Sequence, residues 1–218
     1  MFELYGHPFS LFTWKPLIAL YARRVPFRFR QVDAGHPDNM ARLAAMSPTG
    51  QFPVLVHDDR EICESNVIIE YLDLHAPGDP PMLPEDPRAA LEARMMADVF
   101  DDYVSAPMQQ IAFDALRPEA ERNPGDVAQA RALLDRSYGW LERKLSGREW
   151  ASGGDFGLAD CAAGPAFFYA DWAHPFAGRF PGLAAYRARL LAQPSIRRVV
   201  DEARPYRRLF PLGAPDRD

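Results

Sequence analysis

The sequence predicts an α/β domain followed by an all-α domain, on the basis of three observations. The first 75 or so residues alternate between short runs of period two and runs of helical spacing. A proline-rich stretch at 76–87 then interrupts every regular pattern. Beyond it, apolar residues recur at helical spacing alone. We therefore place one domain at 1–76, a linker at 77–87 and a second domain at 88–218.

The expected order of elements in the first domain is βαβ, then α, then ββα. Alternating polarity predicts its strands, and helical spacing that ends in Arg23-Arg24 predicts its first helix. A turn cluster at 47–50 ends the second helix. In chain order we expect a strand at 2–5, a helix through Leu17 and Tyr21, a strand at 27–30, a helix at 38–46, a hairpin of strands at 54–56 and 61–63, and a helix from Ser65.

The second domain is expected to consist of helices alone. Prolines at 118 and 124 separate the first two of them. An acidic cluster of Asp98, Asp101 and Asp102 lies on the first long helix, and we interpret it as a solvated face. The expected helices cover 87–116, 124–145, 157–171 and 183–193, with a short one near 195–203.

Composition excludes several classes of protein. The 218 residues, 48% of them hydrophobic, are enough for one large core or two smaller ones, and a net charge of −5 argues against a nucleic-acid surface. No apolar run approaches the ~20 residues of a membrane span, and the first residues lack the features of a signal peptide. We therefore expect neither a nucleic-acid nor a membrane partner.

Cysteine and histidine usage indicates neither disulfides nor a metal centre. Cys63 and Cys161 lie far apart without a CxxC motif, so we expect two buried thiols in a cytoplasmic protein. The five histidines show no spacing typical of metal ligands, and no metal site is predicted. His7 is interpreted as a packing or turn residue.

The run from Gly50 to Leu55 places a proline directly before a strand. Such a proline normally lies at a sheet edge or in a special turn, and Phe52-Pro53 is a candidate cis peptide bond. An edge there would expose the N–H and C=O of Phe52 to an extended ligand. The helix start at Ser65 offers N–H groups to a carboxylate, and Glu64 offers a counter-charge to an amine. A strand edge beside a clamp for a zwitterion indicates glutathione.

Several motifs resemble the cytosolic glutathione transferase superfamily. They are Tyr5-Gly6-His7-Pro8-Phe9-Ser10, Gln51-Phe52-Pro53-Val54-Leu55, Glu64-Ser65-Asn66, Ile69-Glu70-Tyr71-Leu72 and the stretch from Gly154 to Asp160. The resemblance covers nearly the whole chain in order and spacing. It implies a thioredoxin-like first domain, an all-helical second domain and a homodimer. It also implies that glutathione is a co-substrate with no further cofactor.

By this resemblance Ser10 matches the activating serine of the serine-type, bacterial-like members, although the class is not assigned. Its hydroxyl would donate a hydrogen bond to the glutathione sulfur and favour the nucleophilic thiolate. The alternative is a turn or N-cap residue. Thr13 is the rival, because Pro16 is best tolerated in a first helical turn and so favours a helix capped at Thr13. We prefer Ser10, with Thr13 as an auxiliary. Phe12, where some classes carry cysteine or asparagine, argues against a disulfide mechanism.

The resemblance also assigns the glutathione contacts. Gln51 would reach the glycyl or cysteinyl end, and Phe52, held by Pro53, would pair with the cysteinyl backbone. Glu64 and Ser65 would form the zwitterion clamp. The alternatives are a solvated turn residue, an edge-strand hydrophobe and an ordinary acidic N-cap.

One departure from the family motif concerns the helical domain. Gly157 stands where the family usually has serine or threonine, three residues before Asp160. Glycine at an N-cap costs only a few tenths of a kcal/mol against serine, and Asp160 is still able to bond back to the backbone. The departure therefore bears on folding rather than chemistry.

The electrophile site is expected between the domains, along the first long helix. Similar apolar stripes also occur in cores, so the electrophile stays unnamed. The candidate lining residues are Tyr103, Met108, Ile111, Phe113, Phe168, Tyr169 and Trp172. The predicted function is a glutathione S-transferase, in detoxification, that adds the thiolate to small apolar electrophiles. The alternatives are a related isomerase, dehalogenase or peroxidase, and a non-catalytic module that binds ligands or partners.

Overall fold

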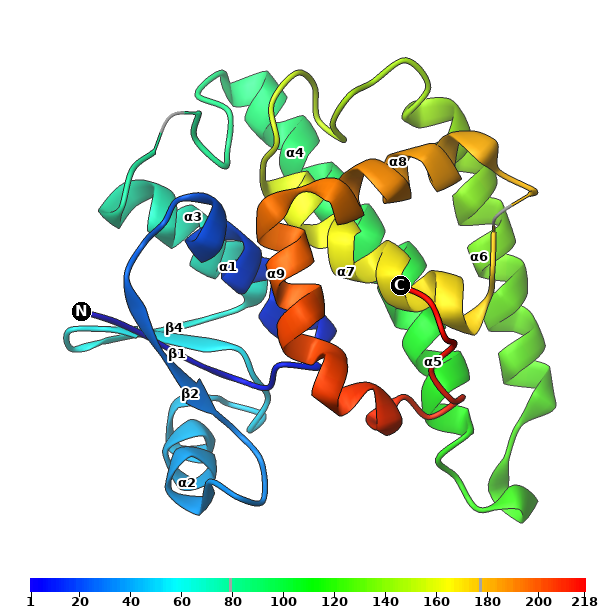
Figure 1. The fold of residues 1–218 in the computed structure, drawn as a ribbon, viewed down its shortest axis with the longest axis horizontal. Coiled ribbons are helices and arrows are strands. Elements are labelled where there is room, and N and C mark those ends of the chain that lie inside the picture. Colours follow the sequence, from blue (N-terminus) through cyan, green and yellow to red (C-terminus); the bar gives the residue numbers. More distant parts are fainter. Residues whose placement is uncertain (79, 177) are drawn as a thin grey trace.

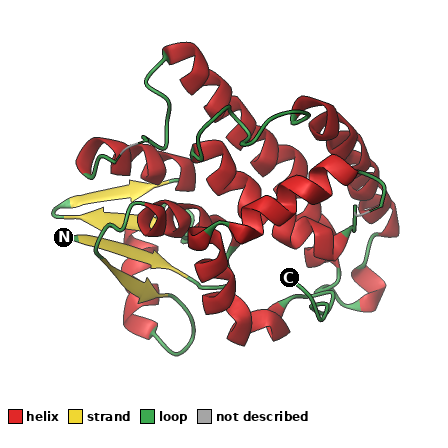
Figure 2. Ribbon diagram, turned by 45° about the horizontal axis from the view of Figure 1, so that its top comes forward, coloured by secondary structure: helices red, strands yellow, loops and turns green. Residues whose placement is uncertain are grey.

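The first part of the chain forms a four-stranded sheet with helices on both faces. The computed structural model describes residues 1–78, 80–176 and 178–218. The strands are β1 (Phe2–Gly6), β2 (Phe27–Gln31), β3 (Val54–His57) and β4 (Arg60–Cys63), in the order β2-β1-β3-β4. β1 pairs in parallel with β2, and the other two pairings are antiparallel. Helix α2 (Pro37–Met46) covers one face, and α1 (Leu11–Ala22) and α3 (Ser65–His75) cover the other (Figures 1 and 2).

This order matches the expected βαβ, α, ββα arrangement, with two corrections. Helix α1 begins at Leu11, so Pro16 lies inside it rather than in its first turn. Pro53 was expected at a sheet edge, but it immediately precedes β3, a central strand. The strand begins after the proline, so the missing N–H costs no hydrogen bond of the ladder.

The second part of the chain is helical throughout its regular elements. The predicted helix over 87–116 is in fact interrupted by a π-helical turn at Asp101–Ser105. Pro107 lies two residues after Ser105 and has no N–H to donate to the preceding turn, which accounts for the irregular hydrogen bonding. The α-helices here are α4 (Pro87–Phe100), α5 (Ala106–Asp114), α6 (Pro124–Lys144), α7 (Leu158–Ala173), α8 (Pro181–Ala192) and α9 (Pro194–Ala203).

Helix α7 joins the two parts of the molecule. Every residue of α7 is buried, and the helix contacts both α1 and α4. One continuous apolar core therefore runs from the sheet through α1, α3 and α4 into α7. None of the helices within the described ranges is long and apolar enough to cross a membrane.

The connection between the parts is tied to both of them. The Asp73 carboxylate on α3 accepts hydrogen bonds from the N–H groups of Met82 and Leu83, at 3.1 and 2.7 Å. The Met82 carbonyl in turn accepts from the N–H of Leu158 at 2.7 Å. The predicted linker at 77–87 includes residue 79, which lies outside the described residues.

Candidate functional site

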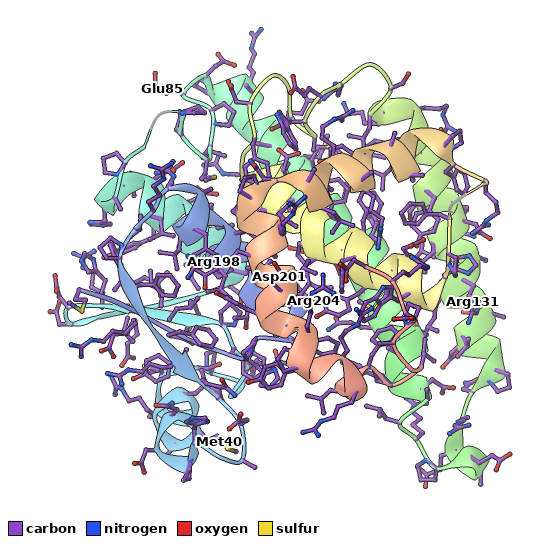
Figure 3. All side chains as sticks on the ribbon, in the orientation of Figure 1. Met40, Glu85, Arg131, Arg198, Asp201 and Arg204 are labelled. Carbon is purple, nitrogen blue, oxygen red and sulfur yellow. The ribbon has the colours of Figure 1, made fainter. Side chains whose placement is uncertain are left out.

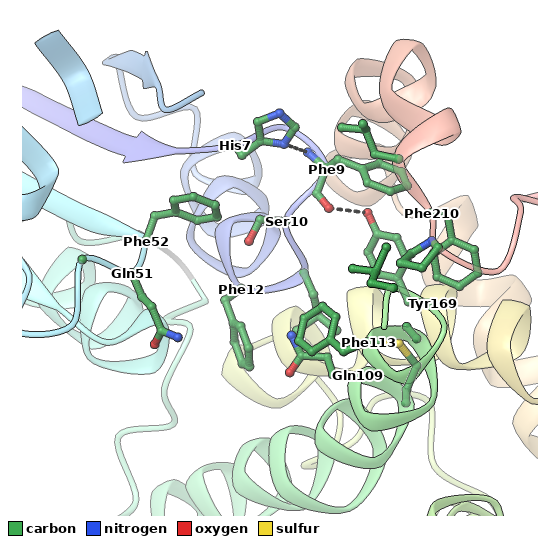
Figure 4. Close-up of a pocket in the computed structure, with 17 residues that line it drawn as sticks. His7, Phe9, Ser10, Phe12, Gln51, Phe52, Gln109, Phe113, Tyr169 and Phe210 are labelled. Atoms are coloured by element: carbon green, nitrogen blue, oxygen red, sulfur yellow. Dashed lines mark hydrogen bonds between the residues drawn. The ribbon is translucent and has the colours of Figure 1, made fainter. Parts of the chain in front are cut away.

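A cavity of about 670 Å³ opens between the two parts of the molecule (Figure 4). Of the residues predicted for the site, Ser10, Gln51 and Phe52 line it, whereas Thr13 and Pro53 do not. Glu64 and Ser65 also lie outside its lining. The wall contributed by α5 and the C-terminal segment consists of Met108, Gln109, Ala112, Phe113, Leu116, Leu209, Phe210 and Pro211.

Ser10 is the N-cap of α1 and faces the cavity. Its Oγ accepts a hydrogen bond from the N–H of Thr13 at 3.2 Å, so its own proton remains free for an acceptor in the cavity. The hydroxyl also lies at the positive end of a 12-residue helix, where negative charge is stabilised. Ser10 is therefore a hydrogen-bond donor placed for an anion.

The expectation that Thr13 caps the helix is wrong. Thr13 is fully buried in the first turn of α1, and its Oγ1 accepts the N–H of His7 at 3.4 Å. Its side chain packs on Gly6 so closely that a Cβ at Gly6 would lie 2.5 Å from the Thr13 Cγ2. This packing turns the Thr13 hydroxyl away from the cavity.

The loop from His7 to Ser10 is held by hydrogen bonds along its backbone. The N–H of Phe9 donates to Nδ1 of His7 at 3.1 Å, and the N–H of Ser10 donates to the His7 carbonyl at 3.0 Å. The indole N–H of Trp14 donates to the Pro8 carbonyl at 2.7 Å. Burial lowers the pKa of His7, although nearby Asp33 opposes this shift. A neutral His7 keeps Nδ1 available as an acceptor.

The predicted cis peptide bond between Phe52 and Pro53 is confirmed. The N–H and C=O of Phe52 have no hydrogen-bond partner among the described residues. In the hairpin, Val54 pairs with Cys63, so the chain just before Val54 lies beside the chain just after Cys63. The free backbone of Phe52 thus lies next to Glu64 and Ser65, although these two do not line the cavity itself.

Helix α3 begins at Ser65, as predicted, and Glu64 occupies its N-cap position. Glu64 has φ 68°, a conformation that is unfavourable for a residue with a side chain, and its carboxylate makes no capping hydrogen bond. Its exposed carboxylate is therefore free for an external cation. The N–H groups of the first turn of α3 have no intrahelical partners and are available to an anion.

The acidic cluster was interpreted wrongly in part. Asp98 and Asp102 are exposed, but Asp101 forms an ion pair with Lys15, whose side chain is fully buried on α1. Asn66, beside Ser65, donates to the same Asp101 oxygen at 3.2 Å. Burial lowers the pKa of Lys15 and raises that of Asp101, and each charge opposes the shift of the other. The opposite charges of Lys15 and Asp101 therefore offset part of the cost of their burial.

Of the seven candidates for the electrophile wall, Met108, Phe113 and Tyr169 line the cavity. Ile111, Phe168 and Trp172 belong to the core, and Tyr103 is half exposed on the π-helical turn. The sequence analysis gave Phe9 and Phe12 no place in the cavity wall, and it did not name Gln109 or the C-terminal residues from Leu209 to Pro211. The C-terminal residues carry no motif, and only the fold brings them to the cavity.

Comparison with known proteins gives matches along most of the chain. The family models for the N-terminal and C-terminal domains of glutathione S-transferase match residues 4–80 and 118–189. A probable glutathione S-transferase of Glycine max is 28% identical over 214 residues, which are 93% of this chain and 89% of the relative. Glutathione S-transferase U6 of Arabidopsis thaliana is 30% identical over 163 residues, covering 74% of this chain and 68% of the relative.

The fold has a close counterpart among solved structures. A glutathione S-transferase from Methylobacterium radiotolerans, crystallised with glutathione sulfonate, superimposes with a TM-score of 0.78 at 29% identity. The match covers 91% of this chain and 94% of that structure. The two-part architecture is therefore a thioredoxin-like domain followed by a helical domain.

Proposed function

The chain belongs to the glutathione S-transferase family, and from this premise we propose that it activates glutathione at Ser10 and adds it to small apolar electrophiles. One observation supports this proposal above the others. The Ser10 hydroxyl lies on the cavity wall, where its oxygen accepts the N–H of Thr13 and its proton is free to be donated. A donor of this kind stabilises a thiolate more than a thiol, so it lowers the thiol pKa.

Glutathione would lie across the mouth of the cavity beside Phe52. Glu64 would pair with its ammonium group, and Ser65 with the first turn of α3 would bind the adjacent carboxylate. The free N–H and C=O of Phe52 would pair with the cysteinyl backbone. Gln51 would donate to the glycyl end. This arrangement brings the sulfur to Ser10.

The electrophile would occupy the apolar half of the cavity. Phe9, Phe12 and Phe113 supply aromatic walls there, and Gln109 is a polar side chain among them. The sulfur of the thiolate would form a bond to the electrophilic carbon. In a substitution, the leaving group would depart with the bonding electron pair. In an addition, water would supply a proton to the product. A mostly apolar wall favours a small hydrophobic acceptor.

The surroundings of this reaction are also proposals. We place the domain boundary within 77–87. We place the protein in the cytoplasm, where its thiols Cys63 and Cys161 stay reduced, and we assign its activity to detoxification.

We further propose a homodimer through α3 and α4. Arg94 on α4 bonds to Glu70 on α3 at 2.8 Å, and this ion pair links the two helices. The two helices expose the large apolar side chains Val67, Leu74, Leu91 and Met95, which would form the interface.

The test of the activating role is Ser10→Ala, read by thiolate ultraviolet absorbance of bound glutathione against pH. We expect the thiol pKa to rise by about one unit, a loss of ~1.4 kcal/mol of thiolate stabilisation, while glutathione affinity changes little. The lost helix cap should also cost ~1 kcal/mol of folding stability.

A matched control separates these two effects. Asp86 caps α4 by accepting the N–H groups of Arg88 and Ala89, far from the cavity. Asp86→Ala should therefore lose similar stability and keep the wild-type thiol pKa. An unchanged pKa in Ser10→Ala would reject Ser10 as the activator.

A further inference from the structure

The hydroxyl of Tyr169 is a polar group at the cavity that the proposed chemistry leaves without a role. Tyr169 lies on α7 with 3% of its surface exposed, and its hydroxyl donates to the Phe9 carbonyl at 3.0 Å. Figure 4 shows this bond beside Ser10, which directly follows Phe9. A residue of the helical domain thus holds the loop that carries Ser10.

The hydrogen bond from Tyr169 completes the restraint of this loop. The N–H groups of Phe9 and Ser10 bond within the loop, both to His7, and Trp14 on α1 holds the Pro8 carbonyl. The partner of the Phe9 carbonyl is Tyr169, which arrives from 160 positions away in the sequence. The Phe9 carbonyl belongs to the peptide group that leads into Ser10, so its direction sets the direction of the Ser10 side chain.

Ring packing and the neutral state of the hydroxyl both maintain the hydrogen bond from Tyr169 to Phe9. The rings of Phe9 and Tyr169 meet edge to face, with centroids 5.3 Å apart and an interplanar angle of 87°. The ring of Trp14 lies 5.2 Å from that of Tyr169. Burial raises the pKa of Tyr169 well above 10, so its hydroxyl remains a neutral donor under physiological conditions.

We propose that Tyr169 is a positioning residue for thiol activation, which it serves by fixing the Phe9–Ser10 peptide so that the Ser10 hydroxyl points at the glutathione sulfur. This inference rests on the proposed function. Loss of the Tyr169 hydroxyl leaves that peptide held only by the bond from the Ser10 N–H to the His7 carbonyl, so it rotates over a wider range. The Ser10 donor then spends less time aligned with the sulfur. Tyr169 also lines the cavity, so one side chain contacts the electrophile and controls the thiolate.

The test compares Tyr169→Phe with Tyr138→Phe. Tyr138 is equally buried, and its hydroxyl also donates to a backbone carbonyl, that of His174 at 3.3 Å, but it does not line the cavity. Thiolate absorbance against pH, glutathione affinity, kcat and melting temperature are measured for both variants. Tyr169→Phe should raise the thiol pKa of bound glutathione by about 0.5–1 unit, which lowers the thiolate fraction roughly three- to tenfold near neutral pH.

We expect kcat of Tyr169→Phe to fall in the same proportion at neutral pH and to recover at high pH, with glutathione affinity within about twofold of wild type. Tyr138→Phe should lose comparable melting temperature and keep the wild-type thiol pKa. Two outcomes would overturn this inference but not the proposed function: an equal shift of the thiol pKa in both variants, or no shift in Tyr169→Phe. Both assume a wild-type protein that lowers the thiol pKa of bound glutathione. A wild-type protein that binds glutathione without lowering the thiol pKa would overturn the proposed function as well.

Discussion

His7 was interpreted from the sequence as a packing or turn residue, and the structure adds a hydrogen bond that depends on its protonation. Nδ1 of His7 accepts the N–H of Phe9, and a protonated ring has no free lone pair to do so. Burial lowers the pKa of His7, which keeps the ring neutral near pH 7. The loop before Ser10 is therefore built for neutral His7.

The sign of the pH dependence follows from this lowered pKa. A group whose pKa is lower in the folded protein contributes stability that is present above its unfolded pKa, ~6.5 for histidine, and is lost as the pH falls through the folded value. In His7→Asn, the amide oxygen can still accept the N–H of Phe9 but does not titrate. Wild type should lose more free energy of unfolding than His7→Asn between about pH 7.5 and about pH 5 in urea titrations. Equal losses of unfolding free energy in wild type and His7→Asn would show that folding does not change the pKa of His7.

At the scale of elements, Gly157 explains why the helical motif departs from its family. Asp160 accepts the N–H of Gly157 at 3.0 Å, so the expected bond back to the backbone is confirmed. A Cβ at Gly157 would lie 2.5 Å from the Met82 carbonyl oxygen, which also accepts the N–H of Leu158. The linker thus approaches the start of α7 so closely that only glycine fits. The missing serine is a consequence of packing.

Restoring the family residue should therefore destabilise this protein. The general capping rule predicts that Gly157→Ser gains a few tenths of a kcal/mol. The contact with Met82 predicts a loss of about 1–3 kcal/mol instead, the usual cost of an overpacked site. Gly154→Ser is the control, because a Cβ at Gly154 meets nothing within 4 Å. Urea unfolding of both variants decides between the two rules, and a more stable Gly157→Ser would contradict the packing argument.

The elements show where sequence reasoning succeeds and where it fails. Local patterns predicted every strand and the α-helices to within a few residues, apart from the start of α1 and the π-helical turn. Both errors involve a proline: Pro16 lies inside α1, where buried packing offsets its missing hydrogen bond, and Pro107 follows the π-helical turn. The motifs also predicted Ser10, Gln51 and Phe52 at one cavity. The ion pair of Lys15 and the hydrogen bond from Tyr169 to Phe9 could not be predicted, because the partners lie 86 and 160 positions away.

At the scale of the whole molecule, the proposed dimer depends on one apolar face. Leu74 on α3 and Leu91 on α4 are 78% and 67% exposed, and exposed apolar side chains that gather in a patch mark protein–protein interfaces. Leu91→Glu should place a charge in the interface and shift the protein from about twice its 24.6 kDa chain mass to the monomer in analytical ultracentrifugation. Met40→Glu, on the opposite side of the sheet on α2 (Figure 3), should leave the mass unchanged. A wild-type mass of one chain would reject the dimer.

The Lys15–Asp101 pair joins the two domains inside their continuous core. Lys15 belongs to α1 and Asp101 to the π-helical turn that follows α4, so the pair forms only when the domains are docked. Removing one member leaves the other charge buried without an opposite charge, which costs about 3–5 kcal/mol. Removing both charges avoids that penalty. The pair should therefore show strong energetic coupling between the domains.

A double-mutant cycle of Lys15→Met, Asp101→Asn and the double variant measures this coupling. We expect each single variant to lose about 3–5 kcal/mol of unfolding free energy, and the double variant to lose clearly less than the sum of the two. Wild type should unfold in a single transition, because the core crosses the domain boundary. In Lys15→Met, Asp101 keeps only its hydrogen bond from Asn66, which is next to Ser65, so domain docking should weaken and glutathione affinity should fall together with stability. Additive single losses would mean that the two charges are stabilised independently, and the docking of the domains would then rest on apolar contacts alone.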